Sequence, residues 1–129
     1  MLARGLRNNN PGNIRHGASW QGMAAEQLDA DFVTFTAPEW GIRAIVRILH
    51  HYQALGITTV TAIISRWAPP NENNTPAYIK SICDYAALAP TDVVPDTALP
   101  AVIKGIIIHE NGSCPYDYDL INKGIALAS

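Results

Sequence analysis

The amino-acid sequence predicts a mainly α-helical (α+β) domain with about five helices and a small β-hairpin lobe near its N-terminus. The first observation is size, because 129 residues, 48% of them hydrophobic and 16% charged, can bury one core. The second is a series of apolar stretches with helical periodicity, separated by breaks rich in Pro, Gly and Asn. The third is a stretch before them that lacks this periodicity. No repeat or linker interrupts the chain, so we expect a single domain over residues 1–129.

The first 35 residues predict a loop followed by a hairpin. The segment RNNNPGNIRHG (residues 7–17) is rich in Asn, Pro and Gly, which favour turns. Between Ser19 and Phe35, a break at Gly22, a polar middle and the closing FVTF indicate a short β-hairpin.

The first long helix is predicted to begin at Thr36. Thr36 can cap the helix, Pro38 suits its first turn, and Glu39 stands where a capping-box partner belongs. Gly56 predicts its end. Its apolar side chains recur at spacings of three and four and give one buried face: Ile42, Ile45, Val46, Leu49 and Tyr52.

Four further helices follow at shorter intervals. The second covers about residues 58–68 and stops before a pair of prolines, which cannot donate backbone hydrogen bonds. The third opens with Thr-Pro and covers about residues 75–87. The fourth, over about residues 96–109, is very apolar, and the last covers about residues 117–126.

Composition excludes several classes of function. Nine Lys and Arg against eleven Asp and Glu give a net charge of −2, so no nucleic-acid partner is expected. No run of 18 apolar residues predicts membrane insertion. Cys83 and Cys114 lack zinc spacing and favour free thiols over one bridge, and the histidines are too scattered for a metal site. We therefore expect neither metal nor cofactor.

The segment IIIHENG (residues 106–112) places an ionisable carboxylate, Glu110, at the end of the most apolar helix. Burying an unpaired charge is costly, so such a Glu is normally solvated, paired or functional. Asn111 and Gly112 predict the end of the helix, where the dipole and partial desolvation both favour a protonated carboxyl. These are the conditions that a general acid needs. The alternative is a Glu that swings into solvent.

Three segments carry a resemblance to a known family: NNNPGNIR (residues 8–15), SWQG (19–22) and FVTFTAPEWGIRAIVRIL (32–49). They resemble a block of the endo-β-N-acetylglucosaminidases that cleave peptidoglycan, including the flagellar type. In that family the general acid lies at the end of an apolar helix before this block, whereas here IIIHENG follows it. The chain therefore resembles a circularly permuted lysozyme-like domain, which is reasonable because domain termini often lie close together.

The order of NNNPGNIR, RWAPPNENNT and HENG along the chain is also similar to that in phage virion proteins. This resemblance implies association with a phage particle, or with a secretion machine. No signal peptide is apparent, so we expect synthesis in the cytoplasm and action on the periplasmic cell wall after delivery by another component.

The resemblance implies two catalytic carboxylates. Glu110 would be the general acid, and Glu26, in the predicted hairpin across the cleft, is the first choice for the second carboxylate. Asp29 and Asp31 in the same hairpin are alternatives, and Glu72 in the later polar loop could also be a second cleft carboxylate. A lytic transglycosylase would need no second carboxylate.

Other residues are predicted to bind sugars. By resemblance, at least one residue of the Asn-rich loop lines the cleft, although these side chains can equally supply left-handed turns. In RWAPPNENNTPAY, aromatic rings can stack on sugars and amides can bind hydroxyls, although this tryptophan can equally belong to the core. The candidates are Asn9, Asn10, Asn13, Trp67, Glu72, Asn73 and Tyr78.

We therefore expect a glycoside hydrolase of the lysozyme, muramidase or glucosaminidase type that cleaves the glycan strand of peptidoglycan. Two alternatives remain open. One is a lytic transglycosylase with the same fold, and the other is a non-catalytic virion or cell-wall-binding module.

Overall fold

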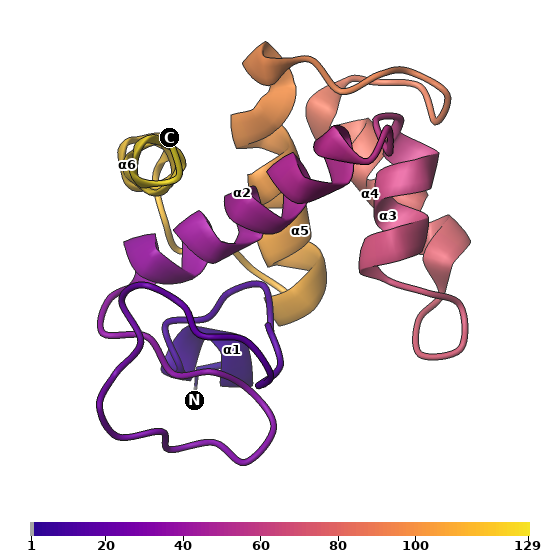
Figure 1. Cartoon of the computed structure of the whole chain (residues 1–129). Helices are drawn as coiled ribbons and strands as arrows, with labels where there is room; N and C mark the ends of the chain where they lie inside the picture. Colours follow the sequence, from indigo (N-terminus) through magenta and orange to yellow (C-terminus); the bar gives the residue numbers. More distant parts are fainter. Residues whose placement is uncertain (1) are drawn as a thin grey trace.

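The computed structural model describes residues 2–129 and is mainly helical (Figure 1). The five expected helices are confirmed, and a short N-terminal helix, α1, precedes them. The elements are α1 (Arg4–Arg7), α2 (Pro38–Ala54), α3 (Val60–Trp67), α4 (Thr75–Ala86), the 3₁₀ turn η1 (Asp96–Ala98), α5 (Leu99–Asn111) and α6 (Tyr118–Leu127).

Side-chain caps explain where three of the helices begin. The side chains of Thr59, Asn74 and Asp117 each accept a hydrogen bond from a backbone N–H in the first turn of α3, α4 and α6, respectively. At the other end of α5, Gly112 adopts a left-handed conformation with φ of 83° and closes the helix.

The predicted capping box at the start of α2 is wrong. The N-cap is Ala37, whose side chain makes no cap, and the Thr36 hydroxyl instead donates to the Gly22 carbonyl over 3.2 Å. Glu39 pairs with Lys123 of α6 at 2.9 Å, and this hydrogen bond lowers the pKa of Glu39. The carboxylate therefore joins two helices rather than capping one.

Helix α5 lies at the centre of the helical core. It packs against α4 and α6, and the first turns of α2 pack against α6 (Figure 1). The apolar side chains of α5 are almost fully buried, as its apolar sequence predicts. The most deeply buried residues of α5 are Val102, Ile103, Ile106 and Ile107.

The predicted β-hairpin is wrong. Among residues 2–129 the structure contains no sheet, and two isolated bridges, Arg15 with Phe32 and Met23 with Phe35, are all the strand pairing in this segment. A few backbone hydrogen bonds cross the segment, such as that from the Val33 N–H to the Ile14 carbonyl, and side chains add to them. The Gln27 amide, for example, donates to the carbonyls of Ala24 and Thr34 over 2.8 and 2.9 Å.

This N-terminal segment, residues 8–35, wraps against α2 and the end of α5 (Figure 1). A Cβ atom at Gly41 of α2 would overlap the Asn9 carbonyl, so the close approach requires glycine. Arg4 forms two hydrogen bonds with Asp29, each 2.6 Å, and one with Asp31 of 2.9 Å. The segment is thus tied to both α1 and α2.

Within residues 2–129, no helix combines the length and apolar character needed to cross a membrane.

The first prediction concerns the contact between α2 and α6. A methyl group at Gly124 would overlap Ile42 near its branch point, where the buried side chain cannot turn aside. We expect Gly124→Ala to lower the free energy of unfolding by about 1–3 kcal/mol, measured by urea denaturation. The matched control is Gly105→Ala in α5, where the closest atom is the flexible Cδ1 end of Ile82 at 2.8 Å. Equal losses in both variants would contradict this account.

The second prediction concerns pH. Hydrogen bonding to Arg4 holds the pKa of Asp29 well below its ordinary value, so on acidification the unfolded chain takes up this proton first. The stabilisation is complete above the unfolded-state pKa of about 3.9 and is lost as the pH falls below it. We expect Asp29→Asn to lower the thermal midpoint at neutral pH and to flatten its decline in acid, measured by circular dichroism.

The control for this prediction is Asp84→Asn. The Asp84 side chain is 65% exposed and pairs with Lys80, whereas that of Asp29 is 11% exposed. An exposed pair contributes little to stability, so the control should keep the midpoint and its pH dependence. A control that behaves like Asp29→Asn would refute the assignment.

Candidate functional site

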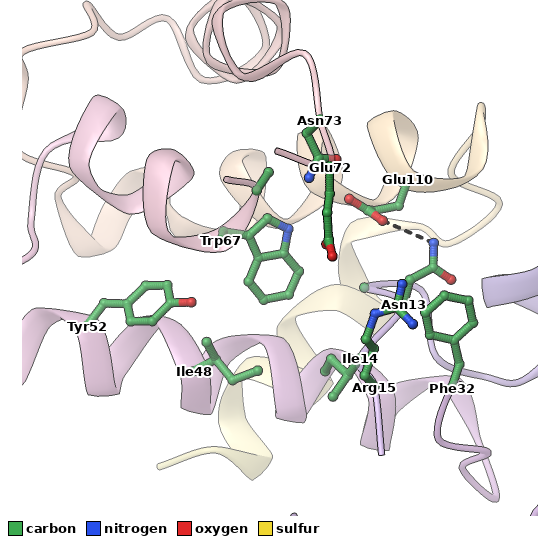
Figure 2. Close-up of a pocket in the computed structure, with 12 residues that line it drawn as sticks. Asn13, Ile14, Arg15, Phe32, Ile48, Tyr52, Trp67, Glu72, Asn73 and Glu110 are labelled. Carbon is green, nitrogen blue, oxygen red and sulfur yellow. Dashed lines mark hydrogen bonds between the residues drawn. The ribbon is translucent and has the colours of Figure 1, made fainter. Parts of the chain in front are cut away.

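A groove of about 630 Å³ lies between the Asn-rich loop, α2, the α3–α4 connection and the end of α5 (Figure 2). One part of its lining is apolar and aromatic, formed by Ile48, Tyr52 and Trp67. Another part is polar and charged, formed by Asn13, Arg15, Glu72, Asn73 and Glu110. A concave site of this size that combines aromatic surface with convergent polar groups is a candidate ligand site.

Glu110 lies in the last turn of α5, at the wall of the groove. The helix ends one residue later because Gly112 turns left-handed and its N–H donates back to the Ile108 carbonyl over 2.7 Å. The buried apolar turns of α5 therefore fix the position of the carboxylate beside the groove.

Both carboxylate oxygens of Glu110 accept hydrogen bonds from distant parts of the chain. The Asn13 amide donates to Oε1 over 3.0 Å, and the Tyr78 hydroxyl donates to Oε2 over 2.9 Å. Figure 2 shows the bond with Asn13 beside the groove. The Trp67 indole N–H in turn donates to the Tyr78 hydroxyl over 3.1 Å. Two distant segments of the chain thus bind the carboxylate directly, and Trp67 of α3 joins the network through Tyr78.

Tyr78 supports this arrangement from within the core. Its side chain is fully buried, and burial, together with the nearby Glu110 carboxylate, raises the pKa of Tyr78 well above its ordinary value. The hydroxyl therefore remains a neutral donor. The ring stacks on His109 with centroids 3.7 Å apart. Tyr78, a predicted sugar-binding residue, contacts Glu110 but is not part of the groove lining.

Asn13 reaches Glu110 because Asn10 folds the loop beneath it. Asn10 is fully buried and its amide donates to the carbonyls of Ile14 and Val33, each over 2.9 Å. The Asn10 carbonyl accepts from the Asn13 N–H over 3.0 Å, and Asn13 itself adopts a left-handed conformation with φ of 51°. Asn10 therefore stabilises the loop from within the core, while Asn13 faces the groove.

Gly5 of α1 allows the loop to approach α5. A Cβ atom there would lie 2.5 Å from Asn111 Oδ1 and 2.6 Å from Asn13 Oδ1. The Asn111 amide donates to the Pro11 carbonyl over 2.8 Å and thereby joins α5 to the loop. Sequence reasoning assigned nothing to Gly5, because a four-residue helix carries no periodic signal.

Glu72 is the second carboxylate in the groove lining, and Asn73 lies beside it. The α3–α4 connection turns back on itself because the Glu72 N–H donates to the Pro69 carbonyl over 3.1 Å. Figure 2 draws the Glu72 side chain extending into the groove beside Trp67. Trp67, Glu72 and Asn73 therefore line the same groove as Glu110.

Glu26 and Asn9 lie elsewhere. Glu26 is exposed and is not part of the groove lining, since the hairpin that would have carried it across the cleft is absent from the described residues. The Asn9 amide donates to the Phe35 carbonyl over 3.1 Å. Asp29 and Asp31, the alternatives to Glu26, bind Arg4.

The chemistry that these residues can supply is acid–base chemistry. Within residues 2–129, no three His, Cys, Asp or Glu side chains gather as a metal site would require. Cys83 and Cys114 are free, and burial raises the pKa of both thiols, which disfavours the nucleophilic thiolate. The groove instead presents two carboxylates, amide groups and aromatic faces.

Comparison with known proteins shows where the chain belongs. No family model matches it. It is 45% identical over 127 residues to a protein named Protein P5 of Pseudoalteromonas phage PM2, and the match covers 95% of this chain and 79% of the phage protein. The chain belongs to the family of this phage protein.

Proposed function

We propose that this protein is a lysozyme-like glycoside hydrolase that cleaves the glycan strand of peptidoglycan, with Glu110 as the general acid. The observation that carries the proposal is the position of Glu110, whose carboxylate lies in the wall of a large groove and is held by Asn13 and Tyr78. Catalytic carboxyls need this kind of fixed geometry, and glycoside cleavage is the reaction in which paired carboxylates flank the scissile bond.

Glu110 would donate its proton to the glycosidic oxygen as the bond to the anomeric carbon breaks. Each carboxylate oxygen has about two acceptor sites and uses one of them inside the protein, so a site remains for the transferred proton. The bonds from Asn13 and Tyr78 keep the side chain from rotating while the proton moves.

Glu72 takes the place of Glu26 as the proposed second carboxylate. Its presence in the same groove as Glu110 supports this change, and Glu26 has no such support. In this role Glu72 would stabilise the oxocarbenium-like transition state or orient the attacking water. A lytic transglycosylase, in which a substrate hydroxyl attacks instead, would have less need of Glu72.

The remaining lining supports a carbohydrate ligand. Trp67 and Tyr52 present aromatic surface that can stack on the apolar faces of sugar rings, whereas Asn13 and Asn73 present amides for hydroxyl and N-acetyl groups. The phage origin of Protein P5 supports association with a virion. Action on the periplasmic cell wall is part of the proposal. A net charge of −2 supports a partner other than nucleic acid.

One observation favours a non-catalytic module as the second candidate. Glu110, Tyr78 and Trp67 form a continuous hydrogen-bonded chain, and such networks also occur as purely structural features of a core. A cell-wall-binding module with this fold would keep the groove and the network without turnover.

The third prediction tests Glu110. Glu110→Gln keeps the shape of the side chain and removes the acid, so we expect the release of soluble fragments from purified peptidoglycan to fall by roughly 10²–10⁴-fold. Thermal unfolding of the variant checks that the fold survives. The matched control is Glu26→Gln, an exposed carboxylate outside the groove, which should keep wild-type activity.

Three outcomes would count against the proposal. If Glu110→Gln is as active as the wild type, Glu110 is not the general acid. If Glu26→Gln loses activity, Glu26 is the second catalytic carboxylate after all. If the wild-type protein binds the glycan but releases no fragments, the binding-module candidate stands instead.

The fourth prediction tests Glu72. If Glu72 assists water or stabilises the transition state, Glu72→Gln should lower fragment release by about 10²-fold or more, and mass spectrometry should find reducing ends in the wild-type products. The control is Asn71→Asp, an exposed neighbour that does not line the groove, which should change little. Anhydro ends in the products, with activity kept in Glu72→Gln, would identify a transglycosylase.

A further inference from the structure

The groove has one basic side chain among its described lining residues, Arg15. It lies beside Phe32, with the guanidinium carbon 5.0 Å from the ring centroid, and Arg15 and Phe32 also form an isolated backbone bridge. Figure 2 draws the Arg15 guanidinium and the Phe32 ring on the side of the groove formed by the N-terminal segment. The bridge and the ring together hold this cation near the Glu110 end of the groove.

Arg15 has no carboxylate partner among the residues that the structure describes. The ion pairs within residues 2–129 join Arg4 to Asp29 and Asp31, and two lysines to acids elsewhere. Arg4 also lies over the Phe32 ring, at 4.5 Å, but its charge is already neutralised. Arg15 therefore presents an unpaired guanidinium to the groove, and a guanidinium is well suited to binding a carboxylate with two parallel hydrogen bonds.

We propose that Arg15 determines specificity by binding a carboxylate carried by a substituent of the glycan. The inference rests on the proposed function and names its substrate class, a glycan in which a sugar next to the bond cleaved at Glu110 bears a carboxylate. In peptidoglycan this carboxylate belongs to the stem peptide, or to the lactyl group of a muramic acid that carries no peptide. The neutral part of the glycan occupies the aromatic side of the groove, along Trp67 and Tyr52.

The charges around Arg15 restrict the ligand to one with few negative groups. Glu72 lines the same groove and repels a polyanion, while one guanidinium can neutralise a single carboxylate. A strand of nucleic acid or a densely sulfated glycan would bring several negative groups close to the Glu72 carboxylate. An isolated carboxylate on an otherwise neutral glycan meets Arg15 alone.

The fifth prediction tests Arg15 by binding, without requiring turnover. In the Glu110→Gln background, calorimetry compares a soluble acidic glycan, the tetrasaccharide of alternating N-acetylglucosamine and N-acetylmuramic acid, with neutral chitotetraose. We expect the acidic glycan to bind roughly ten- to a hundredfold more tightly, as a charge-assisted pair allows. Arg15→Gln should remove this preference and leave chitotetraose binding unchanged. The matched control is Arg7→Gln, an exposed arginine of α1 outside the groove, which should keep the preference.

The outcomes separate this inference from the proposed function. The role of Arg15 is refuted if Arg15→Gln keeps the preference for the acidic glycan, or lowers the affinity for both glycans equally. The hydrolase then still stands if the wild-type protein releases fragments. If the acidic preference depends on Arg15 but no fragments are released, binding specificity stands and catalysis is refuted. If neither glycan binds, the role of Arg15 is refuted, and the hydrolase is refuted with it if the wild-type protein also releases no fragments.

Discussion

The contact of the Glu110 carboxylate with Asn13 and Tyr78 is the interaction on which the geometry of the groove depends. Asn13 comes from the N-terminal segment, Tyr78 from α4, and Glu110 from the end of α5. A partly buried carboxylate must find donors, because leaving it unpaired away from water is costly. Satisfying Glu110 therefore draws the loop and α4 to the same end of α5, and the groove opens where these elements meet.

The N-terminal segment shows how a loop can be held in place without a sheet. Side-chain amides, such as that of Asn10, donate hydrogen bonds to its carbonyls. Its residue Asp29 binds Arg4 of α1. Glycines at positions 5 and 41 let the backbone approach α5 and α2 more closely than any other residue would allow. Rigidity here comes from many specific contacts, and it carries Asn13 and Arg15 to the groove.

The helices and one half of the site were predictable because their signals are local. Apolar residues that recur every three or four positions indicate a buried helix face, whatever the helix packs against. Asn-Gly after an apolar run indicates where α5 ends. The same local reasoning failed for residues 19–35, where the break at Gly22, the polar middle and the closing FVTF suggested a hairpin. Gln27 and other side chains occupy the backbone groups that a ladder would have used.

The sequence by itself determined the helical content, the apolar character of α5 and the presence of Glu110 at its end, because each of these follows from neighbouring residues. Only the tertiary structure decided that Glu72 rather than Glu26 shares the groove, that Tyr78 supports Glu110 from the core, and that Arg15 faces the groove unpaired. These relations join residues from different helices and loops. Their distances depend on how the elements pack, and no local pattern of residues encodes that packing.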